Sequence, residues 1–128
     1  MANELILMIE DNAANRTLIR DVLNFKGYQT LEAETAEEGI ELAREKKPAL
    51  VLMDFQLPGM NGIDAFNVLR GDTATSAIPV IAVTASAMPE DRKKMLAAGF
   101  EGVQTKPIHV MEFIKTVEDT LRKVAAKT

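Results

Sequence analysis

Continuous apolar runs recur along the chain, and residues that favour turns bound each of them. Residues 5–9, 50–53 and 78–83 contain no charged side chain. A short apolar run between turn signals is typical of a strand that is buried on both faces, as in a parallel sheet. The pattern therefore predicts three buried strands in these runs.

Two further segments have weaker strand patterns. Residues 28–33 alternate loosely between apolar and polar side chains, which predicts a more exposed strand near an edge of the sheet. Residues 100–105 carry the weakest strand pattern of the five. The chain is thus predicted to contain five strands.

Helix patterns lie between and after these strands. Asn12, Thr35 and Asn61 favour the N-cap position, and Thr35 begins a capping-box pattern. Pro89 suits the first turn of a fourth helix, which Gly99 would end, and a fifth helix begins near residue 109. Apolar residues recur at helical spacing in four of these segments: Leu18, Val22 and Phe25 beside Ile19 and Leu23; Ile40 and Ala43; Ile63, Phe66 and Leu69; and Phe113, Val117 and Leu121.

Strand and helix alternate five times along the chain. This alternation predicts an α/β domain with a five-stranded parallel sheet, helices on both faces and right-handed connections. The carboxyl ends of parallel strands lie at one edge of the sheet, where open α/β sheets bind their ligands. Five polar side chains follow or end strands and should gather at this edge: Glu10, Asp11, Asp54, Thr84 and Lys106.

Composition narrows the class of protein. The chain has 128 residues, so we expect one domain over residues 1–128, with no output domain attached in this sequence. The absence of cysteine excludes disulfides and thiolate metal sites. The net charge of −4, with both signs interspersed, argues against nucleic acid as a partner. Neither a membrane-spanning run nor a signal segment is apparent, so we expect a soluble, cytoplasmic protein.

The expected cluster favours a hard cation and phosphate chemistry. Carboxylates that lie close together repel one another, and a bound cation or a fixed ammonium relieves the repulsion. Oxygen ligands without Cys or His suit Mg²⁺, and Lys106 supplies the ammonium. A carboxylate beside Mg²⁺, an ammonium and the Thr84 hydroxyl meets the needs of phosphoryl transfer, in which an aspartate can itself carry the phosphoryl group.

Taken together, these residues resemble the receiver domain of two-component response regulators. The resemblance covers essentially the whole chain and implies a flavodoxin-like fold with the strand order 2-1-3-4-5. It rests on four pieces in this order: Glu10-Asp11, Asp54 with the turn at residues 58–62, Thr84-Ala85, and Lys106-Pro107.

The resemblance also implies a role for each residue. Asp54 would be the phosphoacceptor, Thr84 would bind a phosphoryl oxygen, and Lys106 would contact the phosphoryl group. The Mg²⁺ ligands would be Asp11, Asp54 and the Gln56 carbonyl, together with Glu10, which often acts through a water. The resemblance further implies that the peptide bond between Lys106 and the following proline is cis.

A receiver of this kind is a signalling domain. Asp54 would accept a phosphoryl group from a partner phosphohistidine in a Mg²⁺-dependent reaction. The chain would then change conformation or pass the phosphate on. The partners would be a sensor histidine kinase or a histidine phosphotransfer protein, and a downstream effector, with no membrane partner. His109, the only histidine, is expected to be an exposed cap, so the donor histidine belongs to a partner. Such a domain is no independent enzyme, because it catalyses only its own phosphorylation and dephosphorylation.

One position departs from the family pattern. The family usually has Tyr or Phe three residues before the lysine, where this sequence has Val103. In the family that ring swings inward as the threonine moves, so the aromatic half of the output switch is missing here. We therefore expect signalling to rely on Thr84 and loop movement, or the conformational change to be small.

Simpler roles and other functions compete with this interpretation. Asp54 and Thr84 could cap a loop and a helix, and Glu10 and Asp11 could be acids favoured by a helix dipole. An independent aspartyl-phosphate phosphatase would usually carry a second acid two residues after its nucleophile, where Gln56 stands. A nucleotide- or flavin-binding module usually has a Gly-rich loop after the first strand. This chain has Glu10 and Asp11 there, and their carboxylates repel phosphate.

Overall fold

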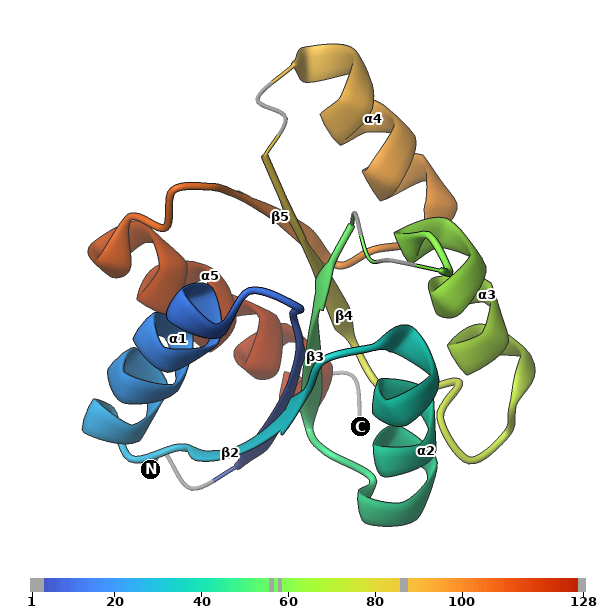
Figure 1. Ribbon diagram of the computed structural model, residues 1–128, viewed down its shortest axis with the longest axis horizontal. Coiled ribbons are helices and arrows are strands. Elements are labelled where there is room, and N and C mark those ends of the chain that lie inside the picture. Colours follow the sequence, from blue (N-terminus) through green and yellow to red (C-terminus); the bar gives the residue numbers. More distant parts are fainter. Residues whose placement is uncertain (1–3, 56, 58, 86–87, 127–128) are drawn as a thin grey trace.

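Five parallel strands form a sheet through the centre of the molecule, in the order β2-β1-β3-β4-β5 (Figure 1). A computed structural model describes residues 4–55, 57, 59–85 and 88–126. The fold class and the strand order are as predicted. The strands are β1 (Leu5–Ile9), β2 (Gln29–Ala33), β3 (Leu50–Asp54), β4 (Val80–Thr84) and β5 (Gly102–Thr105).

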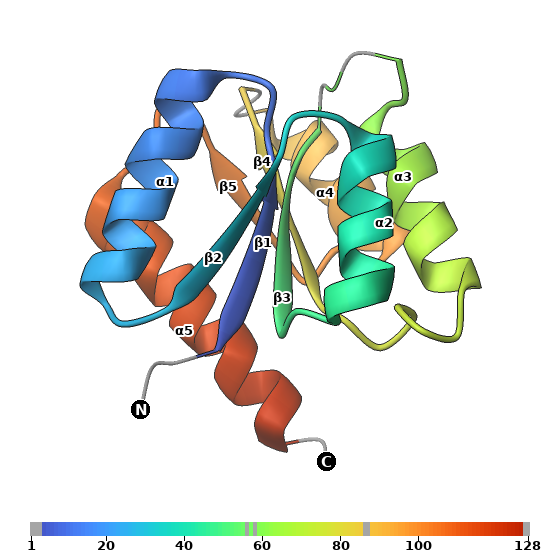
Figure 2. The ribbon, with the colours of Figure 1, turned by 60° about the horizontal axis from the view of Figure 1, so that its bottom comes forward.

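Helices cover both faces of this sheet. Figure 1 and Figure 2 show two helices on one face, α1 (Ala13–Phe25) and α5 (Val110–Ala126). The other face is covered by α2 (Ala36–Lys46), α3 (Gly62–Gly71) and α4 (Pro89–Ala98). None of the helices in the described part of the chain is long and apolar enough to cross a membrane.

Each face of the sheet has its own apolar core. Along β1, Leu7 and Ile9 pack in the core under α2, α3 and α4, whereas Ile6 and Met8 pack in the core under α1 and α5. Successive side chains of a strand point to opposite faces, and here both faces are covered. This double burial is why the central strands have continuous apolar sequences.

The helices begin and end where the capping residues predict. The side chains of Asn12, Thr35 and Asn61 accept the backbone N–H of the residue three positions on, at 3.0, 3.1 and 2.9 Å. Each bond satisfies a donor that lacks a partner within the first helical turn. Pro89 is the first residue of α4, and Gly99 follows its end with a φ of 115°, a conformation that glycine adopts without strain.

Two strands, β4 and β5, begin two residues later than the sequence pattern suggests. β4 begins at Val80 because Pro79, although its carbonyl accepts the Val51 N–H at 3.0 Å, has no N–H to extend the ladder. β5 begins at Gly102 rather than at residue 100. Both strands keep their carboxyl ends, which are the ends that matter for the site.

The apolar pattern of α1 is only partly buried. Ile19 and Leu23 face the core, but Phe25 is 88% exposed. At 3.6 residues per turn, Phe25 lies roughly 160° around the helix from Leu23, so the core cannot cover both side chains. α1 therefore presents an apolar surface to solvent.

Candidate functional site

The side chains expected at the carboxyl edge of the sheet do gather there. They follow or end four neighbouring strands of the sheet: β1, β3, β4 and β5. Asp11 is exposed at this edge, whereas the other carboxylates are buried. The site residues are Glu10 and Asp11 after β1, Asp54 at the end of β3, Thr84 at the end of β4 and Lys106 after β5.

Backbone hydrogen bonds fix the strand ends at this edge. The Phe55 N–H donates to the Val83 carbonyl at 2.8 Å, which continues the pairing of β3 with β4 past Asp54. The Lys106 N–H donates to the Thr84 carbonyl at 2.7 Å, and the peptide bond between Lys106 and Pro107 is cis, as expected. The last residues of three neighbouring strands are therefore held by the sheet itself.

Lys106 lies between two buried carboxylates. Its Nζ is 3.1 Å from Asp54 Oδ2 and 3.1 Å from Glu10 Oε1. Glu10 and Asp54 are only 2% and 4% exposed. A buried carboxylate is costly unless a cation or hydrogen-bond donors face it, and here one ammonium serves two carboxylates.

Glu10 has a further set of contacts that hold it in place. The Asn12 N–H donates to Glu10 Oε2 at 3.1 Å, and Arg16 Nη1 donates to the Glu10 carbonyl at 2.8 Å. Arg16 also pairs with Glu32 and Glu34 at 3.5 and 3.2 Å. Arg16 was not predicted as a site residue, since no motif marks an arginine inside the first helix as a neighbour of the site.

Burial and charge shift the pKa values of this cluster. Burial raises the pKa of the Glu10 carboxyl; Lys106 and the Asn12 N–H oppose the increase, and Asp54 adds to it. Burial alone would lower the pKa of Lys106, but the hydrogen bonds and charges of Glu10 and Asp54 outweigh it and raise that pKa. Lys106 is therefore a cation at neutral pH.

The acidic side chains have the placement and chemistry that a hard cation requires. One carboxylate oxygen from each of Glu10, Asp11 and Asp54 lies within 4.8 Å of the other two. Glu10 Oε1 is buried and lacks a hydrogen-bond partner among the described residues, although the Lys106 ammonium is near. An oxygen-only set of this kind fits Mg²⁺. Gln56, the remaining expected ligand, lies outside the described residues.

Comparison with known proteins decides the family. The model of the response regulator receiver domain matches residues 6–118. The chain belongs to the receiver family of response regulators. It is 40% identical to the polar-differentiation response regulator DivK of Brucella anthropi over 91% of this chain and 94% of that protein, and equally similar to DivK of Brucella ovis. The resemblance stated from the sequence is confirmed, and with it a phosphoacceptor role in signalling.

Solved receiver structures share the fold. The receiver domain of the sensor histidine kinase PA1611 from Pseudomonas aeruginosa is 29% identical, with a TM-score of 0.85 over 94% of this chain and 98% of that one. That structure has a magnesium ion coordinated in its active-site cleft. The chemotaxis response regulator CheY4 of Vibrio cholerae matches with a TM-score of 0.87 over 93% of this chain and 99% of that one, and its 21% identity supports the fold alone.

Proposed function

We propose that Asp54 of this receiver accepts a phosphoryl group from a phosphohistidine of a partner protein, and that Mg²⁺ is required for the reaction. The observation that carries the proposal is the position of Lys106, whose ammonium contacts both Asp54 and Glu10 at the carboxyl edge of the sheet. An ammonium held against a buried aspartate matches the arrangement that phosphoryl transfer needs.

The transfer step itself is a displacement at phosphorus. An Asp54 carboxylate oxygen attacks, an O–P bond forms, and the N–P bond of the phosphohistidine breaks with its electron pair left on the imidazole nitrogen. Lys106 donates N–H groups to the phosphoryl oxygens, and the Thr84 hydroxyl donates to one of them. Because Glu10 and Asp54 raise the pKa of Lys106, its side chain carries a positive charge before the transfer begins.

The same acidic residues are the proposed metal ligands. Asp11, Asp54 and the Gln56 carbonyl would bind Mg²⁺ directly. Glu10 would bind it through a water molecule. Bound Mg²⁺ would neutralise negative charge on the phosphoryl oxygens. One carboxylate oxygen from each of Glu10, Asp11 and Asp54 lies within 4.8 Å of the other two, which supports this assignment.

We propose that the phosphorylated state is signalled through Thr84 and the loop that follows it. Val103 lies in the core under α4 with Met95 and Phe100, so β5 carries no ring that could swing inward at this position. Beryllofluoride, a phosphoryl mimic, should therefore change backbone amide shifts chiefly near Thr84 and little in β5 and α4. Large shifts throughout β5 and α4 would contradict this proposal.

We propose that residues 1–128 form one receiver domain that works in the cytoplasm. It would receive the phosphoryl group from a sensor histidine kinase or a histidine phosphotransfer protein. A downstream effector would recognise the phosphorylated face. The only reactions that its own residues catalyse would be the phosphorylation and dephosphorylation of Asp54.

Intact-protein mass after incubation with a small acyl phosphate tests the proposed function. We expect one added phosphoryl group with Mg²⁺, none with a chelator, and none in Asp54→Asn. Asp64→Asn, which changes an exposed aspartate in α3, is the matched control and should be phosphorylated normally. Phosphorylation that persists in Asp54→Asn or in the presence of chelator would contradict the proposal.

A further inference from the structure

Arg16, near the start of α1, contacts the peptide unit that joins two of the proposed site residues. Its Nη1 donates to the Glu10 carbonyl at 2.8 Å. That carbonyl belongs to the planar unit between Glu10 and Asp11, so the hydrogen bond restrains the backbone that carries both carboxylates. A hydrogen bond from a charged donor is roughly twice as strong as one between neutral groups. Arg16 is therefore placed to influence the proposed metal site without being one of its ligands.

Two acids at the end of β2 hold the guanidinium in this position. Arg16 Nε lies 3.5 Å from Glu32 Oε1, and Arg16 Nη2 lies 3.2 Å from Glu34 Oε1. Each of the three nitrogens thus faces a different acceptor, which the planar fork of an arginine allows and the compact ammonium of a lysine does not. The Arg16 side chain is only 14% exposed, so water competes little for these contacts.

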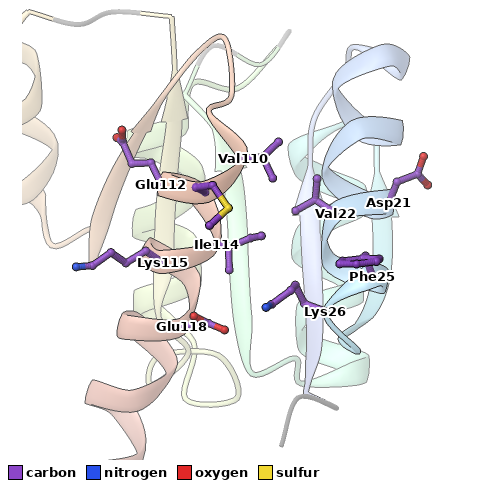
Figure 3. A pocket seen from close by; sticks show the side chains of 10 residues that line it. Asp21, Val22, Phe25, Lys26, Val110, Glu112, Ile114, Lys115 and Glu118 are labelled. Atoms are coloured by element: carbon purple, nitrogen blue, oxygen red, sulfur yellow. The ribbon is translucent and has the colours of Figure 1, made fainter.

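The packing of α1 gives Arg16 a fixed base. Ile19 and Leu23, further along the same face of the helix, are buried in the core under α1 and α5. Figure 3 shows Val22 of α1 and Ile114 of α5 pointing into the groove between the two helices. Because the core holds the helix, the position of the guanidinium relative to β1 is set by the fold.

The other polar groups of Glu10 are held by different segments. Its N–H donates to the Ala33 carbonyl at 2.9 Å, and its Oε2 accepts the Asn12 N–H at 3.1 Å. The bond from Arg16 restrains the next peptide unit, which leads to the exposed Asp11. Arg16 thus connects the better-held carboxylate of the site to the more exposed one.

We propose that Arg16 is a positioning residue for Mg²⁺, whose guanidinium, fixed by two acids at the end of β2, holds the Glu10 carbonyl and so orients the Glu10 and Asp11 side chains. The inference rests on the proposed function, in which both carboxylates take part in binding Mg²⁺. Groups that hold metal ligands in place typically contribute about 10–100-fold to metal affinity.

The charge of Arg16 acts in the opposite direction. A cation near the site repels Mg²⁺, so the charge alone would weaken binding. Any gain in affinity from Arg16 must then come from the placement of the ligands. Positioning and charge therefore predict changes of opposite sign when Arg16 is replaced by a neutral residue.

Titration of the full chain with Mg²⁺, followed by backbone amide shifts without a phosphodonor, tests this role. Arg16→Met keeps an apolar stem of similar length but removes the charge and the donors. We expect Mg²⁺ to bind about tenfold more weakly to this variant. If only the charge of Arg16 mattered, the same substitution would tighten binding.

Arg20→Met is the matched control. Arg20 lies about one turn further along α1, and its described contacts are with Glu32 and Asp21, at 3.4 Å each. The substitution removes the same charge from the same helix but spares the bond to the Glu10 carbonyl. Mg²⁺ should bind to this variant at least as tightly as to the unchanged chain.

Arg16→Lys separates the shape of the side chain from its charge. The ammonium can donate to the Glu10 carbonyl but cannot face all three acceptors as the guanidinium does. We expect binding about threefold weaker than in the unchanged chain, and tighter than in Arg16→Met. This conservative variant keeps the test decisive if urea unfolding shows that Arg16→Met does not fold.

Two results would overturn the positioning role of Arg16. One is a folded Arg16→Met chain that binds Mg²⁺ as tightly as the unchanged chain or more tightly. The other is unchanged affinity in Arg16→Lys. Failure of the proposed function gives a different result, because the unchanged chain and Arg20→Met would then also fail to bind Mg²⁺.

Discussion

At the edge of the sheet, two carboxylates with almost no exposed surface share one ammonium. Glu10 and Asp54 each lie 3.1 Å from Lys106 Nζ, and Asp11 lies beside them in solvent. This arrangement leaves net negative charge in a buried place, which a metal ion would offset. At the scale of single residues, Lys106 is therefore both a structural partner of the carboxylates and a proposed donor to the phosphoryl group.

Replacement of Lys106 by methionine should separate these two roles. Lys106→Met leaves two buried carboxylates without their cation, so we expect the free energy of unfolding to fall by about 1–3 kcal/mol. The rate of phosphorylation by acyl phosphate should fall at least about tenfold, since a charged donor to the phosphoryl oxygens is lost. Urea unfolding in chelator and timed intact-mass measurements check the two effects.

Lys93→Met is the matched control, because Lys93 is exposed on α4. It should leave both the unfolding curve and the phosphorylation rate unchanged. A Lys106→Met chain that unfolds and is phosphorylated like the control would show that the ammonium contributes neither stability nor catalysis.

At the scale of elements, the strand ends place the chemistry and the helices hold the strands. α2 packs closely on β1, the strand that leads into Glu10, and Gly39 is the point of contact. A Cβ on Gly39 would overlap the Cδ1 and Cγ1 atoms of Ile9, which is fully buried. Gly71, at the end of α3, has open space around it.

Gly39→Ala should therefore destabilise the protein although alanine favours helices. Overpacking of a buried contact costs about 1–3 kcal/mol, which exceeds the gain of roughly 1 kcal/mol in helix propensity. Gly71→Ala, the matched control, should leave stability nearly unchanged. Thermal unfolding of both variants checks this expectation, and equal stability of the two would contradict the close packing of α2 on β1.

On the face of the sheet that α2, α3 and α4 cover, the aromatic contacts centre on Phe100 rather than on β5. Phe100 stacks on Phe66 with ring centroids 4.3 Å apart and meets Phe55 edge-on at 6.2 Å. Phe55 directly follows Asp54, so this cluster connects the residue after the proposed phosphoacceptor with α3. Because β5 carries Val103, the aromatic rings near the site are those of Phe55, Phe66 and Phe100, which pack against one another.

At the scale of the whole molecule, the sequence predicted the elements and the edge where the site lies. Continuous apolar runs marked the buried strands, and Asn12, Thr35 and Asn61 marked helix starts, because these signals are local. The direct contact between Lys106 and Glu10 and the anchoring role of Arg16 depend on distances between segments far apart in the chain. The exposure of Phe25 depends likewise on how α1 is rotated against the core. Local patterns fix none of these.

Binding of Mg²⁺ should stabilise the whole fold. A ligand that binds only the folded state at ten times its dissociation constant adds about 1.4 kcal/mol, or a few degrees in Tm. Asp11→Asn should remove most of this increase without lowering stability in chelator, because Asp11 is exposed. Calorimetric scans with Mg²⁺ and with chelator check the effect, and an unchanged Mg²⁺ response in Asp11→Asn would remove Asp11 from the ligands.

Chemical marking of the phosphorylated residue tests the central claim most directly. Borohydride reduces an aspartyl phosphate to homoserine, and peptide mass spectrometry then locates the converted residue. After phosphorylation with Mg²⁺ we expect homoserine at position 54 alone, and none without the phosphodonor. Homoserine at position 11 or at any other aspartate, with position 54 unchanged, would contradict the assignment of Asp54 as the phosphoacceptor.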